Sequence, residues 1–238
     1  MNKQFQSQDT LGGIVLKFPQ AADLFKQYGL DFCCGGDRSL AAASNEHQID
    51  QTSLLEELNE RYEDALKVGL VTKDWMSVSF EQLIHHIVNT HHAYLNQAFP
   101  TLSELTLKIL RVHGQHHGDT LSVVHQKFSE LRSGLEAHMI KEEEVIFPQI
   151  VDYEKSPSET KRESLQQLLS ELDREHEESG AILKVIREVT ANYALPEDAC
   201  NTFAYVYRSL EDMEANIFEH IHLENNVLFL RLSEQTVA

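Results

Sequence analysis

The stretch EAHMIKEEEVIFPQI, residues 136–150, places a histidine and a glutamate where an apolar stripe should continue. The steps along this stripe alternate between three and four residues, so its side chains share one face of a helix. Its members are Leu121, Val124, Phe128, Leu131, Leu135, His138, Glu142 and Val145. A buried ionisable group is costly unless it is paired or binds a metal. Either the helix breaks its own pattern here, or the interior needs His138 and Glu142 as ligands.

The last part of the chain repeats this arrangement. Its stripe consists of Phe203, Val206, Leu210, Met213, Ile217, His220, Glu224 and Val227. A single His-x-x-x-Glu pair would mean little, because such neighbours are common on helix surfaces. Two pairs, each in register with an apolar stripe, favour a buried metal site over two solvated faces.

Two further segments can each supply a histidine to the same interior. His176 lies on a stripe with Leu165, Leu169, Leu172, Leu183 and Ile186. In LIHHIVNTHHAYLNQAF, residues 83–99, periodicity allows either His91 or His92 to face inward, while His85 and His86 are expected at the surface or supporting the ligands. About four imidazoles with two carboxylates suit iron, manganese or zinc. Six ligands exceed a closed tetrahedral zinc site, and two glutamates from opposite helices can bridge two ions.

The pattern along the whole chain is helical. Long helices are predicted at about 78–112, interrupted near Pro100, at 119–147, closed by Pro148, and at 160–191 and 197–232. We therefore predict an all-α protein in which residues 78–238 form an antiparallel four-helix bundle. Residues 1–70 are predicted to form a small N-terminal helical domain, which contains the Cys-Cys-Gly-Gly motif at 33–36.

Composition limits the partners and the cellular location that we expect for this protein. The formal net charge of −18 repels phosphate backbones, so a nucleic-acid partner is not expected. We see neither an apolar run long enough for a membrane span nor a signal peptide. Three cysteines with one adjacent pair form no disulfide framework, so a reducing cytoplasm is expected.

Five motifs, taken in order, resemble a known family. They are YGLDFCCGG, HHIVNTHH, AHMIKEEEVIFP, REHEESG and EHIHLENNVLF. In this combination the chain resembles the di-iron proteins that repair iron centres, the ScdA/YtfE-type iron–sulfur cluster repair proteins, over nearly its whole length. The resemblance implies a hemerythrin-like bundle and a role in restoring clusters after nitrosative or oxidative damage.

The resemblance also implies a ligand set for two non-haem iron ions, bridged by carboxylates and by an oxo or hydroxo group. The implied ligands are His92, His138, Glu142, His176, His220 and Glu224, with the glutamates as bridges. It favours His92 over His91. His113 also matches a family histidine and is a candidate further ligand or supporting group. His116, His117 and His125 have no assigned role; they are expected at the surface, with contact to iron in transit as the alternative.

The adjacent cysteines allow two interpretations. They could be small buried fillers beside Gly35 and Gly36, or thiol donors for iron, nitric oxide or redox exchange. The family signature favours the second, with Cys33 and Cys34 as a thiol relay to the iron pair. Cys200 is expected only to pack near a helix start.

Several functions remain open at this level. Cluster repair could proceed by iron donation or by nitric oxide reduction, which would make the protein an enzyme. The alternatives are a hemerythrin-like protein that binds or senses a diatomic gas without turnover, and an interaction module with an acidic surface. Expected partners are damaged iron–sulfur proteins or a cluster scaffold, and nitric oxide, but neither nucleic acid nor a membrane. The oligomeric state is open, with a homodimer as one option.

Overall fold

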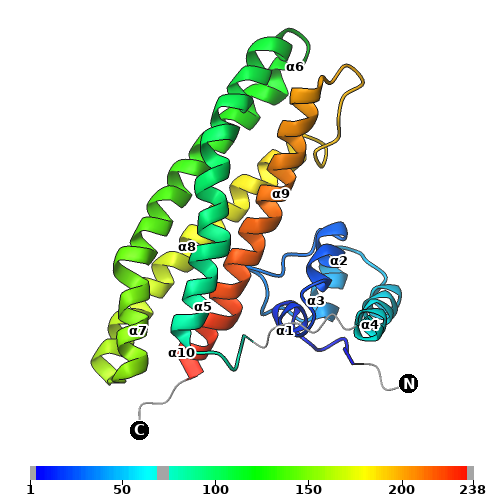
Figure 1. Cartoon of the computed structure of the whole chain (residues 1–238). Helices are drawn as coiled ribbons and strands as arrows, with labels where there is room; N and C mark the ends of the chain where they lie inside the picture. The colour runs from blue at the N-terminus through cyan, green and yellow to red at the C-terminus, as the bar shows by residue number, and fades with distance from the viewer. Residues whose placement is uncertain (1–3, 69–74, 235–238) are drawn as a thin grey trace. The chain divides into compact units, whose positions relative to one another are not determined.

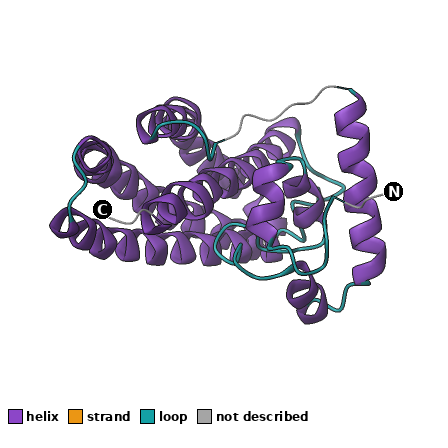
Figure 2. Ribbon diagram, turned by 90° about the horizontal axis from the view of Figure 1, so that it is seen from below, coloured by secondary structure: helices purple, strands orange, loops and turns teal. Residues whose placement is uncertain are grey.

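The computed structural model describes residues 4–68 and 75–234, and the regular elements within those ranges are helices (Figures 1 and 2). The β-type pairing described there is an isolated antiparallel bridge between Thr10 and Ser39. The predicted all-α class is therefore confirmed. None of the helices in the described part of the chain is long and apolar enough to cross a membrane.

The described residues divide into two compact units. One comprises residues 4–68, 75–79 and 221–234, and the other comprises residues 80–220. The boundary between His220 and Ile221 lies inside a continuous helix, so this helix contributes to both units. The division into domains at 1–70 and 78–238 stays a prediction.

The unit of residues 80–220 begins with a helical hairpin. Its first rod consists of α5 (Phe80–Ile87), the π-helical segment η1 (Val88–His92) and the first part of α6 (Ala93–Lys141). Figure 1 shows α6 turning back on itself, and His117 has the non-helical backbone angles of that turn. Across the hairpin Thr106 Oγ1 lies 3.0 Å from His125 Nδ1, so the two arms run antiparallel.

Three more stretches complete the bundle. The second arm of α6 continues through the π-helical segment η2 (Glu142–Ile146) into α7 (Phe147–Lys155). α8 (Glu159–Val189) then packs antiparallel to this arm, because Lys141 pairs with Glu171 at 2.9 Å. α9 (Asn201–Leu223) reverses again, and Arg187 of α8 pairs with the buried Glu214 of α9 at 2.6 Å. Buried leucines, isoleucines, valines and phenylalanines fill the space between the rods.

The sequence predicted that one helix is interrupted near Pro100 and that another ends at Pro148, but both helical rods continue past these residues. Pro100 lies within α6, and the helix continues past it. The backbone hydrogen bond lost at a proline is costly, but burial of the flanking Phe99 and Leu102 offsets it. Pro148 stands at the start of α7, where a missing N–H costs least, so the rod continues to Lys155.

Where the second arm of α6 continues into η2, the residues that face inward also differ from the prediction. A strict three-and-four spacing placed Val145 inside, whereas Val145 is 43% exposed and Ile146 is fully buried. The reason is η2: a π-helical turn accommodates an extra residue and advances the helix face by about one position. A sequence pattern based on the α-helical period cannot show such an insertion.

The other unit is built from four N-terminal helices and the end of the last rod. The N-terminal helices are α1 (Leu11–Lys17), α2 (Ala21–Gln27), α3 (Leu40–Glu46) and α4 (Gln51–Lys67). The end of the last rod consists of the π-helical η3 (Glu224–Phe229) and α10 (Leu230–Glu234). Thr10, Ser39 and Asp50 cap the starts of α1, α3 and α4 through their side-chain oxygens. Phe5 and Phe18 pack against Tyr62, so an aromatic cluster forms the core of the short helices.

Candidate metal centre

Six buried side chains converge within hydrogen-bonding or near-contact distance. They are His92, His138, Glu142, His176, His220 and Glu224, and none is more than 3% exposed. The Nε2 atoms approach one another in pairs, with His92 Nε2 3.1 Å from His220 Nε2 and His138 Nε2 3.2 Å from His176 Nε2. Glu142 Oε2 lies between the pairs, 3.4 Å from His92 Nε2 and 3.3 Å from His138 Nε2.

These side chains form two overlapping groups that could each hold an ion. One group is His92, Glu142, His220 and Glu224, and the other is His138, Glu142, His176 and Glu224. Within each group the ligand atoms all lie within 4.8 Å of one another. The two groups share both glutamates and differ only in their histidines. Such an arrangement fits two neighbouring cations that share two carboxylates.

The imidazole spacing suits a metal. Two nitrogens bound to one ion at about 2.1 Å would lie about 3.0 Å apart at an octahedral angle and about 3.4 Å apart at a tetrahedral one. The separations of 3.1 and 3.2 Å fall within this range. Neutral imidazole and carboxylate are also the donors preferred by iron, manganese and zinc. The donor set therefore fits a metal centre of the predicted kind.

The π-helical segments coincide with the ligands. η1 ends at His92, η2 begins at Glu142, and η3 begins at Glu224. π-Helical turns are rare and occur frequently at functional sites, because they redirect a side chain without breaking the helix. His138 and His220 each precede a glutamate by four residues, so one helical face presents each pair.

Two outer carboxylates orient the histidines. Glu143 Oε1 lies 2.7 Å from His92 Nδ1, and Glu175 Oε2 lies 2.8 Å from His138 Nδ1. A ring that donates Nδ1–H to a carboxylate keeps its Nε2 lone pair for a metal. The hydrogen bond with His138, assisted by Lys141, lowers the pKa of Glu175 to about 2, so this group stays ionised.

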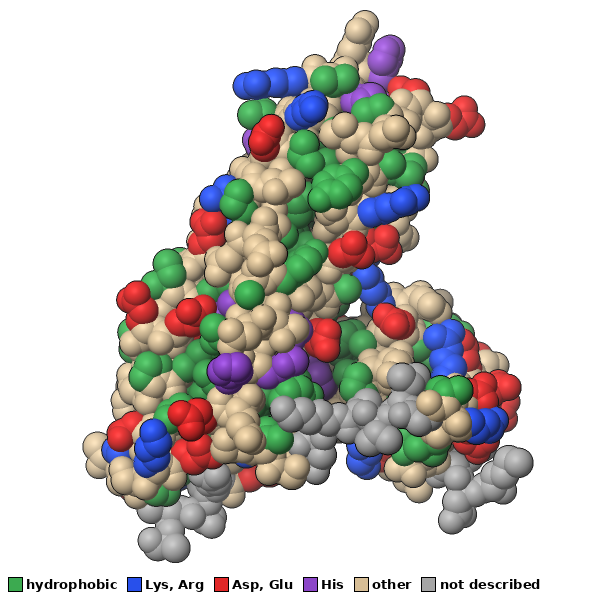
Figure 3. All heavy atoms as spheres, in the orientation of Figure 1, with side chains coloured by type: hydrophobic (Ala, Val, Ile, Leu, Met, Phe, Trp, Pro, Cys, Tyr) green, Lys and Arg blue, Asp and Glu red, His purple; other side chains and the backbone are tan. Residues whose placement is uncertain are grey.

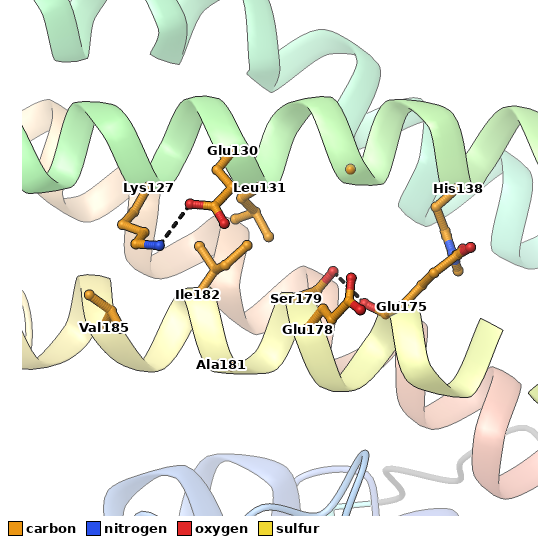
Figure 4. Close-up of a pocket in the computed structure, with 11 residues that line it drawn as sticks. Lys127, Glu130, Leu131, His138, Glu175, Glu178, Ser179, Ala181, Ile182 and Val185 are labelled. Carbon is orange, nitrogen blue, oxygen red and sulfur yellow. Dashed lines mark hydrogen bonds and ion pairs between the residues drawn. The ribbon is translucent and has the colours of Figure 1, made fainter. Parts of the chain in front are cut away.

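A pocket of about 450 Å³ between α6 and α8 reaches His138. Figure 4 shows His138 and Glu175 at one end of this pocket, with Lys127 and Val185 toward the other. Leu131 and Ile182 give the middle an apolar lining. The pocket thus provides an approach for small molecules to one histidine of the centre.

The remaining predicted histidines are not brought to this centre. His113 lies 21 residues beyond His92 along a helical rod, which corresponds to about 30 Å, and its Nε2 is 3.2 Å from Cys200 Sγ. His117 pairs with Asp198 at 2.8 Å, and His116 is exposed. Cys200 is exposed rather than packed, because it lies just before α9. On the face shown in Figure 3, histidines gather both near the top and lower on the bundle, although the six-residue centre is buried.

The three cysteines are all free. Cys33 is buried and Cys34 is half-buried, in a loop that also contains Asp31. Asn226, two residues after Glu224, donates its side-chain amide to the backbone oxygens of Phe32 and Cys33. A thiol relay from this loop to the iron pair stays a prediction.

Sequence reasoning missed several polar groups. Glu143 and Glu175 each stand next to a predicted ligand, but a single helical period assigns both to the outer face. His222 is buried as well, and burial lowers the pKa of His222 to about 4. His91, which periodicity had allowed to face inward, is also buried. The clusters KEEE and REHEE were the available signal, because a ligand histidine usually has a carboxylate neighbour.

The architecture and the centre together define a class: a helical bundle whose buried histidines and glutamates are arranged as they would be to hold metal ions. Consistent with this, residues 83–232 match the family described as the hemerythrin HHE cation binding domain. Residues 7–62 match the domain ScdA_N, described as a domain of unknown function (DUF542).

Curated relatives refine this assignment. The chain is 33% identical over 227 residues to the iron-sulfur cluster repair protein ScdA of Staphylococcus epidermidis, covering 95% of this chain and 98% of that protein. It is also 33% identical over 221 residues to the iron-sulfur cluster repair protein YtfE of Salmonella choleraesuis, covering 93% and 94%. The chain therefore belongs to the ScdA/YtfE family of iron–sulfur cluster repair proteins, as its sequence motifs indicated.

Proposed function

We propose that this protein repairs damaged iron–sulfur clusters by means of two non-haem iron ions held by the six converging side chains. The observation that supports this most is the sharing of Glu142 and Glu224 by both ligand groups. Each ion would have its own pair of histidines, His92 with His220 and His138 with His176. Glu142 and Glu224 would be shared by both ions. Two relatives of the chain are named iron-sulfur cluster repair proteins.

The protein's own side chains have separate tasks in this proposal. Glu143 and Glu175 hold the Nδ1 sides of His92 and His138, so that both Nε2 atoms face the metal. The carboxylates of Glu142 and Glu224 neutralise positive charge in a region that excludes water, since both are fully buried.

Bound iron would supply redox electrons or would itself be the cargo. In the first route, two nitric oxide molecules take up two electrons and two protons and give nitrous oxide and water. In the second route, one iron passes to a damaged cluster or a cluster scaffold. Both routes remain part of the proposal, and a cytoplasmic setting agrees with the three free cysteines.

The first experiment tests whether the centre is needed for repair. A Glu142→Ala/Glu224→Ala protein should keep its helical circular dichroism, lose the two irons of the bundle centre and fail to restore a nitric oxide-damaged [4Fe–4S] protein. Glu144→Ala is the matched control, because Glu144 is exposed in the same π-helical segment. Full repair by the double variant, with iron lost, would refute the proposal.

A second experiment separates the routes. The reduced, iron-loaded protein is exposed to nitric oxide anaerobically, and nitrous oxide is measured by gas chromatography. Release of nitrous oxide over several turnovers supports the nitric oxide reduction route. A stable nitrosyl complex, together with transfer of labelled iron to a cluster protein, supports donation. A stable complex without transfer or repair would instead indicate a gas-binding protein.

A further inference from the structure

The loop at residues 31–36 brings three metal-binding side chains together outside the bundle centre. Cys33 Sγ lies 3.2 Å from Asp31 Oδ1 and 3.8 Å from Cys34 Sγ. One ligand atom from each of Asp31, Cys33 and Cys34 lies within 4.8 Å of the other two. None of these residues belongs to the six-residue centre, so this is a distinct cluster.

The sulfur spacing corresponds to chelation rather than to a disulfide. A disulfide would hold the sulfurs at about 2.05 Å, and both cysteines are free. Two thiolates bound tetrahedrally at about 2.3 Å to one ion would lie about 3.8 Å apart. The Sγ–Sγ separation of 3.8 Å, at which the two thiols contact each other, is also compatible with chelation of one cation.

The backbone holds the loop in this conformation. Asp31 Oδ1 accepts the N–H groups of Cys33 and Cys34, both at 3.0 Å. Asn226 donates to the Cys33 carbonyl at 3.1 Å, and Gly12 N donates to Gly36 O at 2.8 Å. A Cβ at Gly36 would lie 2.4 Å from the backbone oxygen of Phe32, so the close packing of the loop requires glycine there. Preformed ligands lose little conformational entropy when they bind.

We propose that Asp31, Cys33 and Cys34 form a second, exchangeable site for a divalent thiophilic cation such as Fe²⁺. Two thiolates select a thiophilic cation, and the carboxylate adds affinity for a divalent one. Three protein ligands leave a coordination position for an incoming donor, which is typical of transfer and catalytic sites and not of closed structural sites. Asp31 is exposed and Cys34 is half-buried, so this position is accessible to an acceptor.

The test uses the full-length protein with its bundle centre already loaded with iron, and Co²⁺ as the probe. Under anaerobic, phosphine-reduced conditions we expect one further equivalent of Co²⁺ to bind with a thiolate-to-cobalt charge-transfer band. Co²⁺ should also protect Cys33 and Cys34 from alkylation, measured by mass spectrometry. Cys200, which is exposed, should stay reactive and serves as an internal reference.

Three variants define the ligands. Cys34→Ser should weaken Co²⁺ binding by at least about 100-fold, more than the roughly 10–100-fold typical for an outer-sphere partner. Asp31→Asn keeps an oxygen that accepts the loop N–H groups but loses the charge, so a loss on the order of tenfold is expected. Cys200→Ser is the matched control and should bind like the wild type.

Several outcomes would overturn the site. They are the absence of the charge-transfer band in wild-type protein, unchanged alkylation of Cys33 and Cys34 with Co²⁺ present, or equal binding by Cys34→Ser. The wild-type protection measurement needs no variant to fold. The Glu142→Ala/Glu224→Ala protein should retain the band, so failure of the bundle proposal can be distinguished from failure of this one.

Discussion

At the scale of single residues, the two halves of the centre are supported unequally. Glu175 is bonded through both oxygens, to His138 at 2.8 Å and to Lys141 at 3.0 Å, and its side chain is 29% exposed. Glu143 bonds His92 at 2.7 Å and is 39% exposed. The ring of His138 should therefore be the more firmly oriented of the two, because its carboxylate partner is itself held.

This inequality predicts the effect of Glu175→Gln. The amide removes the negative charge that favours Nδ1–H on His138, so metal affinity at the centre should fall by roughly 10–100-fold. Competition with a chelator measures the loss. Glu178→Gln is the control, because Glu178 lies on the same helix with its side chain 69% exposed. Equal metal retention in the two variants would show that Glu175 does not support the centre.

At the scale of elements, the π-helical segments explain where the α-helical pattern failed. Each of η1, η2 and η3 has a centre residue at one end, namely His92, Glu142 or Glu224. The stripe was right up to Glu142 and wrong at Val145, since the extra residue of η2 rotates everything after it. The π-helical turn thus adjusts the direction of a ligand while the apolar face downstream still meets the core.

Deletion of Glu144 tests this interpretation. Removing one exposed residue from η2 should restore an ordinary α-helix and keep Phe147 and Ile150 buried, so metal binding should be lost while the thermal midpoint stays close to that of the iron-free wild type. Deletion of the exposed Ser133 from the regular part of α6 is the control. It turns all later residues by about 100° and should unfold the bundle. If the Glu144 deletion unfolded the bundle as much as the Ser133 deletion does, the proposed role of η2 would be contradicted.

A buried tyrosine of α9 makes a prediction about pH. Burial raises the pKa of Tyr207 to about 12, whereas an unfolded tyrosine ionises near about 10. Below pH 10 both states keep the proton, and between pH 10 and 12 only the unfolded state loses it, so stability falls as the pH rises.

Denaturant unfolding at two pH values checks this. From pH 10 to pH 11, Tyr207→Phe should lose about 1 kcal/mol less free energy of unfolding than the wild type. Tyr205→Phe, an exposed neighbour on the same helix, should lose as much as the wild type. An identical loss in Tyr207→Phe and Tyr205→Phe would rule out the effect.

At the scale of the whole molecule, metal binding and stability should be coupled. The six converging side chains include two fully buried glutamates, whose charges a cation would neutralise. A ligand at a hundredfold excess over its dissociation constant stabilises the folded state by about 2.7 kcal/mol. Iron should therefore contribute to the folding of the bundle as well as to its chemistry.

Removing the metal tests this coupling. The iron-free protein should melt at a lower temperature, and its amides in η2 and around His176 should exchange faster with deuterium. Exchange in α1–α4 should change less, because none of the six side chains lies in those helices. Equal exchange with and without iron across residues 80–220 would contradict a metal centre there.

The sequence by itself determined the helical class, because the α-helical period is a local property. It also determined that five histidines and glutamates on the apolar stripes point inward, and the cost of burying ionisable groups indicated that they serve as ligands. His138, Glu142, His176, His220 and Glu224 are indeed buried. The choice of His92 over His91 came from family resemblance, since periodicity left both open. Only the tertiary structure revealed Glu175 beside His138 and Asn226 beside the Cys33 carbonyl, 37 and 193 residues apart in the chain. Such pairs follow from how separate helices pack, and a single-helix pattern contains no information about the neighbour.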